Sequence, residues 1–178
     1  MELDRHLILM GLRASGKSTI GRVIARRIGV GFVDLDQVTF RLMRVKSAAE
    51  GINLHGIDAF RSAESRALTE TLNSPPSVLA LGGGTPTAPG AASSLRHTDA
   101  TTIYFRAQPD VLAARLAKTD LASRPSLTGR GAVEEVGELF RDRDPLYASL
   151  SSLTLDVDEL SIDDAADRVI AFIEHPQA

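Results

Sequence analysis

The 178-residue sequence contains no cysteine, and aromatic residues make up only 4% of it. Without cysteine the chain can form no disulfide, use no thiolate nucleophile and hold no cysteine-ligated zinc. The four histidines are too widely spaced to suggest a metal cluster: His6, His55, His97 and His175. Any bound metal is therefore expected to be a hard cation with oxygen ligands.

The sequence also lacks an excess of positive charge and a long apolar run. Twenty Lys and Arg residues stand against 23 Asp and Glu residues, for a formal net charge of -3. With no basic arm and few aromatic side chains to stack on bases, this composition argues against a nucleic acid partner. The apolar run HLILM (6–10) is too short for a signal-peptide core, and no run is long enough to span a bilayer. We therefore expect a cytoplasmic protein with no membrane partner, and its small size favours a monomer.

What is present indicates one α/β domain with a substantial core, since 43% of the residues are hydrophobic. Short apolar runs alternate with amphipathic segments, the pattern of β-α-β units around a mainly parallel sheet. The expected strands are 6–10, 31–35, 77–81, 101–105 and 152–157.

Two helices have recognisable ends in the sequence. Helical spacing predicts one between the first two strands, with an apolar face at Ile20, Val23, Ile24 and Ile28. Gly29 is expected to end this helix in a left-handed cap. Ser161 is expected to cap the N-terminus of the last helix. The apolar face of that helix is expected at Ile162, Ala166, Val169, Ile170 and Ile173.

The stretch GLRASGKST (11–19) matches the phosphate-loop pattern G-x-x-x-x-G-K-[ST]. A strand, a glycine-rich turn and a helix direct backbone N–H groups and the positive end of the helix at one phosphate. Lys17 is expected to reach the β- and γ-phosphates of ATP or GTP, and the Ser18 hydroxyl to ligate Mg²⁺. The alternative, a chance match in a flexible loop, does not explain the flanking strand and helix. The expected nucleotide-binding residues here are Gly11, Ala14, Ser15, Gly16, Lys17, Ser18 and Thr19.

Two aspartates, Asp34 and Asp36, follow in FVDLD at the end of the second expected strand. Period-two alternation would place both on one side of the strand, at the carboxyl edge where open α/β sheets bind ligands. One could orient water around Mg²⁺, and the other could accept a proton from a substrate hydroxyl or hydrogen-bond to it. The alternative is that both are solvated turn residues.

Six segments together resemble the shikimate kinase family, in this order between about Leu9 and Tyr147: GLRASGKSTIGR, FVDLD, FRSAE, LALGGGTPT, SRPSL and RDRDPLY. The resemblance implies a three-layer α/β/α P-loop kinase fold with a central five-stranded parallel sheet and a mobile lid. It implies a single kinase domain over residues 1–178, a substrate-binding helical segment at about 36–72 and a lid at about 119–131. The implied reaction transfers the γ-phosphoryl group of ATP to the 3-hydroxyl of shikimate, with Mg²⁺.

The resemblance also implies roles for individual residues. Arg61 and Arg143 match the arginines that bind the shikimate carboxylate, as suits a guanidinium fork. Asp36 matches the aspartate that contacts the hydroxyls, and is the candidate base. Glu64 matches a glutamate that helps hold Arg61, with an ordinary helix-surface ion pair as the alternative. The expected substrate-binding residues are Asp36, Arg61, Glu64, Gly82, Gly83, Gly84 and Arg143.

The remaining implied residues concern the metal, the lid and the adenine. Ser18 and Asp34 are the expected metal site. Arg124, before Pro125, matches a lid arginine that neutralises charge on the transferred phosphoryl group, so that Lys17, Asp36 and Arg124 are the expected catalytic residues. Lys118 falls near a family arginine that lies against the adenine, and Arg115 is the alternative.

The sequence departs from the family pattern at several positions. Arg13 and Ala14 occupy positions where related kinases often have glycine, and Ala14 is strained if its φ angle is positive. Ile57 stands where the family commonly has glutamate, and the segment 41–56 differs from the usual pattern. Two other functions remain open: a different small-molecule P-loop kinase, such as a gluconate kinase, and a non-catalytic nucleotide-binding module.

Overall fold

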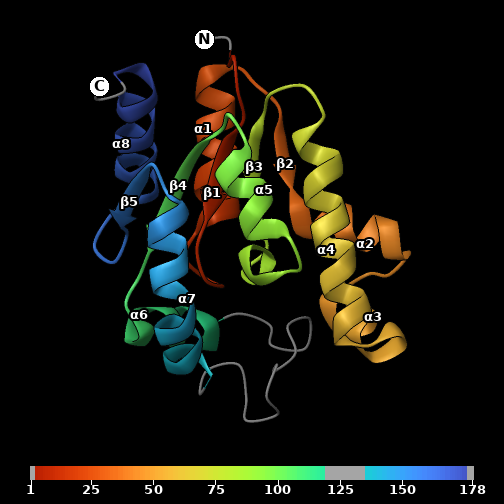
Figure 1. Cartoon of the computed structure of the whole chain (residues 1–178). Coiled ribbons are helices and arrows are strands. Elements are labelled where there is room, and N and C mark those ends of the chain that lie inside the picture. Colours follow the sequence, from red (N-terminus) through yellow and green to blue (C-terminus); the bar gives the residue numbers. More distant parts are fainter. Residues whose placement is uncertain (1–2, 119–134, 176–178) are drawn as a thin grey trace.

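The computed structural model describes residues 3–118 and 135–175, and these contain a parallel sheet between two layers of helices (Figure 1). The strands are β1 (Leu7–Met10), β2 (Phe32–Asp34), β3 (Val78–Ala80), β4 (Thr101–Arg106) and β5 (Leu153–Asp156). All pair in parallel, in the order β2-β3-β1-β4-β5. The five expected strands are therefore confirmed, with each boundary within one residue of the expected position.

The helices are α1 (Lys17–Ile28), α2 (Leu35–Met43), α3 (Ala48–His55), α4 (Ile57–Leu72), α5 (Ala91–His97), α6 (Pro109–Ala117), α7 (Val136–Leu150) and α8 (Ile162–Glu174). A 3₁₀ turn, η1 (Thr85–Thr87), follows β3. Helices α1 and α8 pack together on one face of the sheet, while α4, α5 and α7 cover the other face (Figure 1). The central strand β1 and its neighbour β3 are buried along their whole length, as expected for a sheet covered on both sides.

Both expected helix caps are confirmed. Gly29 ends α1 with a left-handed backbone (φ 75°), and the Ser161 hydroxyl oxygen accepts a hydrogen bond from the Asp164 N–H at the start of α8. The apolar face predicted for α8 was wrong at one position, because Ile162 is 46% exposed. Ile162 lies in the first turn, and the face of α8 that packs on α1 is centred on the buried Ala165 and Val169.

The segment expected to bind substrate folds as α2, α3 and α4, which pack against one another beside β2 (Figure 1). The rings of Phe40 and Phe60 lie 6.5 Å apart between α2 and α4. A Cβ atom on Gly51 would lie 3.0 Å from the Phe60 ring, so α3 approaches α4 closely only because glycine stands there. The expected lid at 119–131, with Arg124, lies outside the described residues. None of the described helices combines the length and the apolar character needed to cross a membrane.

Candidate active site

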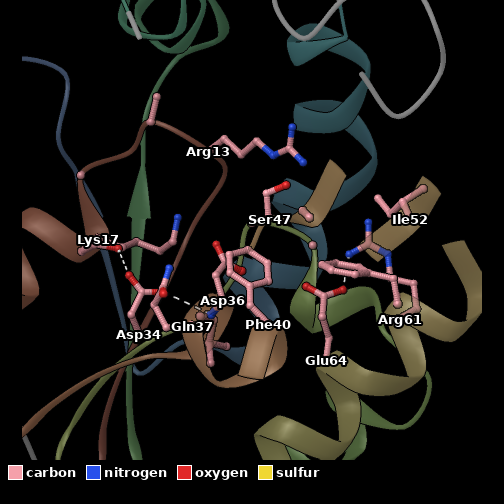
Figure 2. A pocket seen from close by; sticks show the side chains of 18 of the residues that line it. Arg13, Lys17, Asp34, Asp36, Gln37, Phe40, Ser47, Ile52, Arg61 and Glu64 are labelled. Carbon is pink, nitrogen blue, oxygen red and sulfur yellow. Dashed lines mark hydrogen bonds and ion pairs between the residues drawn. The ribbon is translucent and has the colours of Figure 1, made fainter. Parts of the chain in front are cut away.

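A cleft of about 520 Å³ opens at the carboxyl ends of β1, β2 and β3 (Figure 2). The loop after β1, the start of α2, helices α3 and α4, the glycine turn after β3 and one face of α7 line it. This is the edge at which open α/β sheets bind ligands, because each strand there ends in a loop that can present side chains and N–H groups. The lining includes six residues that the sequence motifs had indicated: Lys17, Ser18, Asp34, Asp36, Arg61 and Arg143.

The phosphate loop between β1 and α1 has the backbone that the motif requires. Gly11 and Gly16 have φ angles of 149° and 96°, and a Cβ atom on Gly11 would lie 2.5 Å from the Phe105 carbonyl oxygen. Ala14 also has a positive φ, of 63°, so the strain that the sequence left conditional is present. An L-residue in this left-handed region is less stable than glycine by roughly 1 kcal/mol.

Replacing Ala14 with glycine is therefore expected to raise the free energy of unfolding by up to about 1 kcal/mol, because glycine adopts this φ without strain. Urea unfolding followed by circular dichroism measures the change. Ala171→Gly is the matched control: Ala171 is exposed within α8, and glycine there is expected to lower stability by up to about 1 kcal/mol. If both variants were destabilised alike, the positive φ of Ala14 would carry no strain.

Hydrogen bonds hold the Lys17 ammonium group and the Ser18 hydroxyl in place. The buried Lys17 donates through Nζ to the Leu12 carbonyl at 2.8 Å and lies 3.4 Å from the Ser15 hydroxyl. The Ser18 hydroxyl donates to Asp34 Oδ2 at 2.9 Å. A hydroxyl and a carboxylate thus lie side by side at the start of α1, a donor set suited to a hard cation.

The prediction that period-two alternation aligns Asp34 and Asp36 was wrong in its geometry. Strand β2 ends at Asp34, whose Oδ1 accepts a hydrogen bond of 3.2 Å from the Asp36 N–H and so caps α2. Asp36 lies in the first turn of that helix and not on the strand. Both carboxylates still line the cleft, because the cap turns the chain across the end of the sheet.

Asp36 has an environment unlike that of a surface carboxylate. Burial, followed by the negative charges of Asp34 and Glu64, raises its pKa to about 6, although Lys17 and Arg13 act in the opposite direction. A Cβ atom on Gly82 would overlap the Asp36 carboxylate, so glycine at this position makes room for it. A carboxylate with a pKa near neutrality, facing a cleft, is a candidate proton acceptor.

Glu64 holds Arg61 from beneath the cleft. Its side chain is 3% exposed and receives a hydrogen-bonded ion pair from Arg61 Nη1 and a 3.1 Å hydrogen bond from the Thr85 hydroxyl. The alternative of an ordinary surface ion pair is therefore wrong. A Cβ atom on Gly84 would overlap the Arg61 guanidinium, which explains why glycine stands there.

The turn after β3 also receives α7. The Gly83 carbonyl accepts hydrogen bonds from Arg143 Nη1 at 2.9 Å and from the buried Tyr147 hydroxyl at 2.7 Å. One turn of α7 is joined to β4 through Asp144, which accepts from the Tyr104 hydroxyl at 2.9 Å and from Arg106 Nε at 2.8 Å. These contacts orient α7 so that Arg143 lines the cleft.

Of the two residues considered for the adenine side, Arg115 lines the cleft and donates to the Val157 carbonyl at 2.9 Å. Lys118 ends α6 with an exposed side chain and is not among the described residues that line the cleft. Among the described residues, Arg115 therefore lines the cleft and Lys118 does not; which of them contacts the nucleotide stays a prediction. Thr19 is exposed at the start of α1 and also lines the cleft.

Comparisons with known proteins identify the family. The shikimate kinase family model matches residues 13–174. The chain belongs to the shikimate kinase family.

Curated relatives in the family cover nearly the whole chain. Shikimate kinase 2 of Yersinia enterocolitica is 37% identical over 155 residues, which are 86% of this chain and 87% of the relative. The shikimate kinase of Nitratidesulfovibrio vulgaris is 39% identical over 144 residues, 80% of this chain and 81% of the relative. The solved shikimate kinase of Acinetobacter baumannii, in complex with shikimate, superposes with a TM-score of 0.90. It is 24% identical, and the match covers 99% of this chain and 96% of that one. The resemblance noted in the sequence and the P-loop kinase fold are thus confirmed.

The sequence motifs did not predict several other residues that line the cleft of this shikimate kinase family member. They are Gln37, Phe40, Lys46, Ser47, Ile52 and Phe60. Phe60 stands in the motif FRSAE but had no role assigned to it, and Phe40 lies outside every quoted motif. An apolar residue on an amphipathic helix carries no local signal that separates a cleft wall from the core. Arg13 was noted only as a departure from the loop pattern, yet it too lines the cleft.

Proposed function

We propose that this protein is an ATP-dependent shikimate kinase, which transfers the γ-phosphoryl group of ATP to the 3-hydroxyl of shikimate. The observation that carries the proposal is the arrangement of one cleft: a phosphate loop at one end, Arg61 paired with the buried Glu64 at the other, and Asp36 between them. Shikimate is a small carboxylate with three ring hydroxyls, so its site needs both a cationic fork and a hydroxyl-binding acid.

On the nucleotide side, the loop N–H groups and Lys17 would bind the phosphates of ATP. Ser18 and Asp34 fit Mg²⁺, since they offer a hydroxyl and a carboxylate already joined at 2.9 Å. When bound, Mg²⁺ would neutralise negative charge on the phosphates. Arg115 would lie toward the nucleoside.

On the acceptor side, Arg61 and Arg143 would bind the carboxylate. Arg61 donates through Nη1 to Glu64, and Arg143 donates through Nη1 to the Gly83 carbonyl. A guanidinium has five N–H groups, so each can still donate to a carboxylate. Gly84 and Gly83 provide a floor without side chains, while Phe40, Phe60 and Ile52 add an apolar wall suited to a ring.

Asp36 would accept the proton of the reacting hydroxyl as the acceptor oxygen attacks the γ-phosphorus. We further propose that residues 119–131, including Arg124, form a lid that excludes water, a competing acceptor. The single-domain organisation over 1–178, the substrate-binding role of 36–72, the monomeric state and the cytoplasmic location stay predictions.

The proposal is tested by measuring ADP release from MgATP in the presence of shikimate, quinate or gluconate. We expect strong stimulation by shikimate alone. Stimulation by gluconate instead would indicate a different small-molecule kinase. ATP binding without stimulation by any of the three acids would favour a nucleotide-binding module without this activity.

A further inference from the structure

Arg13 is the third residue of the phosphate loop, and its side chain faces the cleft. It is half-buried and lines the same cavity as Lys17 and Asp36. Figure 2 shows it extending from the loop over the space that these two residues also face. Solvation alone does not explain why the loop directs a charged side chain into a phosphate site.

The loop backbone determines this direction. Leu12, the preceding residue, is 5% exposed and anchored in the core, and its carbonyl closes a turn with the Ser15 N–H at 3.3 Å. Ala14, the following residue, has the left-handed φ of 63°. Between them, Arg13 packs against Gly83: a Cβ atom there would lie 3.0 Å from the Arg13 backbone nitrogen and 3.1 Å from its Cγ. The absence of a side chain at Gly83 therefore leaves the room that Arg13 occupies.

Arg13 and Lys17 both come from the phosphate loop region and line the cleft together with Asp36. Two positive charges therefore border the space into which the carboxylate that would hold the reacting hydroxyl also faces. The arginines proposed for the shikimate carboxylate, Arg61 and Arg143, are held separately by Glu64 and Gly83. Arg13 comes instead from the loop that binds phosphate, so its position suits the phosphoryl group better than the carboxylate.

On the basis of the proposed function, we propose that Arg13 binds the phosphoryl group during transfer and in the phosphorylated product, together with Lys17. In this step the acceptor oxygen forms a bond to the γ-phosphorus as the bond from phosphorus to the β,γ-bridging oxygen breaks. ADP leaves with that electron pair, and the hydroxyl proton passes to Asp36. Charge spreads over the three equatorial oxygens of the phosphoryl group, and a guanidinium can donate two hydrogen bonds to them.

The test compares Arg13→Met, which keeps much of the side-chain length but removes the charge, with Arg13→Lys, which keeps the charge. Isothermal titration calorimetry measures binding of shikimate and of shikimate 3-phosphate to each protein, and steady-state kinetics gives kcat. For Arg13→Met we expect about tenfold weaker binding of the phosphorylated product and at least about tenfold lower kcat, the scale of one lost charge-assisted hydrogen bond. Shikimate affinity should change less than about twofold, and Arg13→Lys should recover part of the loss.

Arg96→Met is the control for the loss of one positive charge, since Arg96 is exposed on α5 away from the cleft and should behave as wild type. Thermal melting establishes that each variant is folded. Equal weakening of shikimate and its phosphate, weakening of shikimate alone, or no change in either would overturn the role of Arg13. If the wild-type protein bound ADP but neither acid, the proposed function itself would fail, and with it this inference.

Discussion

Replacing Asp36 with asparagine is expected to lower kcat by at least roughly a hundredfold while leaving the affinity for MgATP nearly intact. Asparagine keeps the size of the side chain and can still hydrogen-bond to a hydroxyl, but it cannot accept the proton. MgATP should bind as before because its proposed contacts lie in the loop 11–19, at Asp34 and at Arg115. Steady-state kinetics and calorimetric titration of MgATP measure the two quantities. A variant with near-normal turnover would remove Asp36 from this role.

The pH dependence gives a second measurement on the same variant. Burial, Asp34 and Glu64 raise the pKa of Asp36 to about 6 in the free protein. The ionised carboxylate is the proton acceptor, so kcat/KM for shikimate should fall as the pH drops through about 6 and reach a plateau above it. The asparagine variant should lack this acidic limb. Asp58→Asn is the matched control, because Asp58 is exposed on α4 and outside the cleft lining, and it should keep the wild-type profile.

Replacing Arg61 with alanine is expected to raise the KM for shikimate at least about tenfold, as charge-assisted hydrogen bonds to a carboxylate are lost. The KM for ATP should change by less than about threefold, because Arg61 lies beyond Asp36 from the phosphate loop. The variant also leaves the buried Glu64 without its cation, which destabilises the fold by about 3 kcal/mol or more if the carboxylate stays charged. Thermal melting should therefore show a lower Tm.

Helix α4 offers a matched control for this experiment. Arg66 pairs with Glu70 at 2.8 Å, but its side chain is 71% exposed. Arg66→Ala should therefore cost at most about 1 kcal/mol of stability and leave both KM values unchanged. A parallel rise of the two KM values in Arg61→Ala would identify Arg61 as a structural arginine rather than a carboxylate-binding one.

The local sequence does not distinguish Arg61 from Arg66. Arg61 and Arg66 each have a glutamate three or four positions later on the same helix, so local spacing treats them alike. Glu64 of the first pair is buried beside the glycine turn after β3 and Arg61 is largely covered, whereas the second pair faces solvent. The difference comes from packing between α4 and the turn at 82–85, which helical periodicity does not contain.

The alternation of apolar and polar residues also failed to predict which element holds Asp36. The alternating pattern of FVDLD correctly paired two aspartates at the end of β2, but the strand stops at Asp34 because that side chain caps α2. Period-two alternation places side chains on one side only while the chain stays a strand. Both aspartates line the cleft, but their expected placement on one side of a strand was wrong.

The sequence by itself determined the parallel α/β alternation, the phosphate loop and the caps at Gly29 and Ser161. Each of these depends on the order of residues within one segment: apolar periodicity, glycine at positive φ, or a hydroxyl one turn from an N–H group. Only the tertiary structure decided that Glu64 is buried, that Arg115 and not Lys118 is among the described residues lining the cleft, and that Arg13 lines the same cleft as Asp36. The physical reason is that burial and electrostatic coupling depend on which segments distant in sequence pack against one another. These segments meet only when the sheet brings the ends of its strands together.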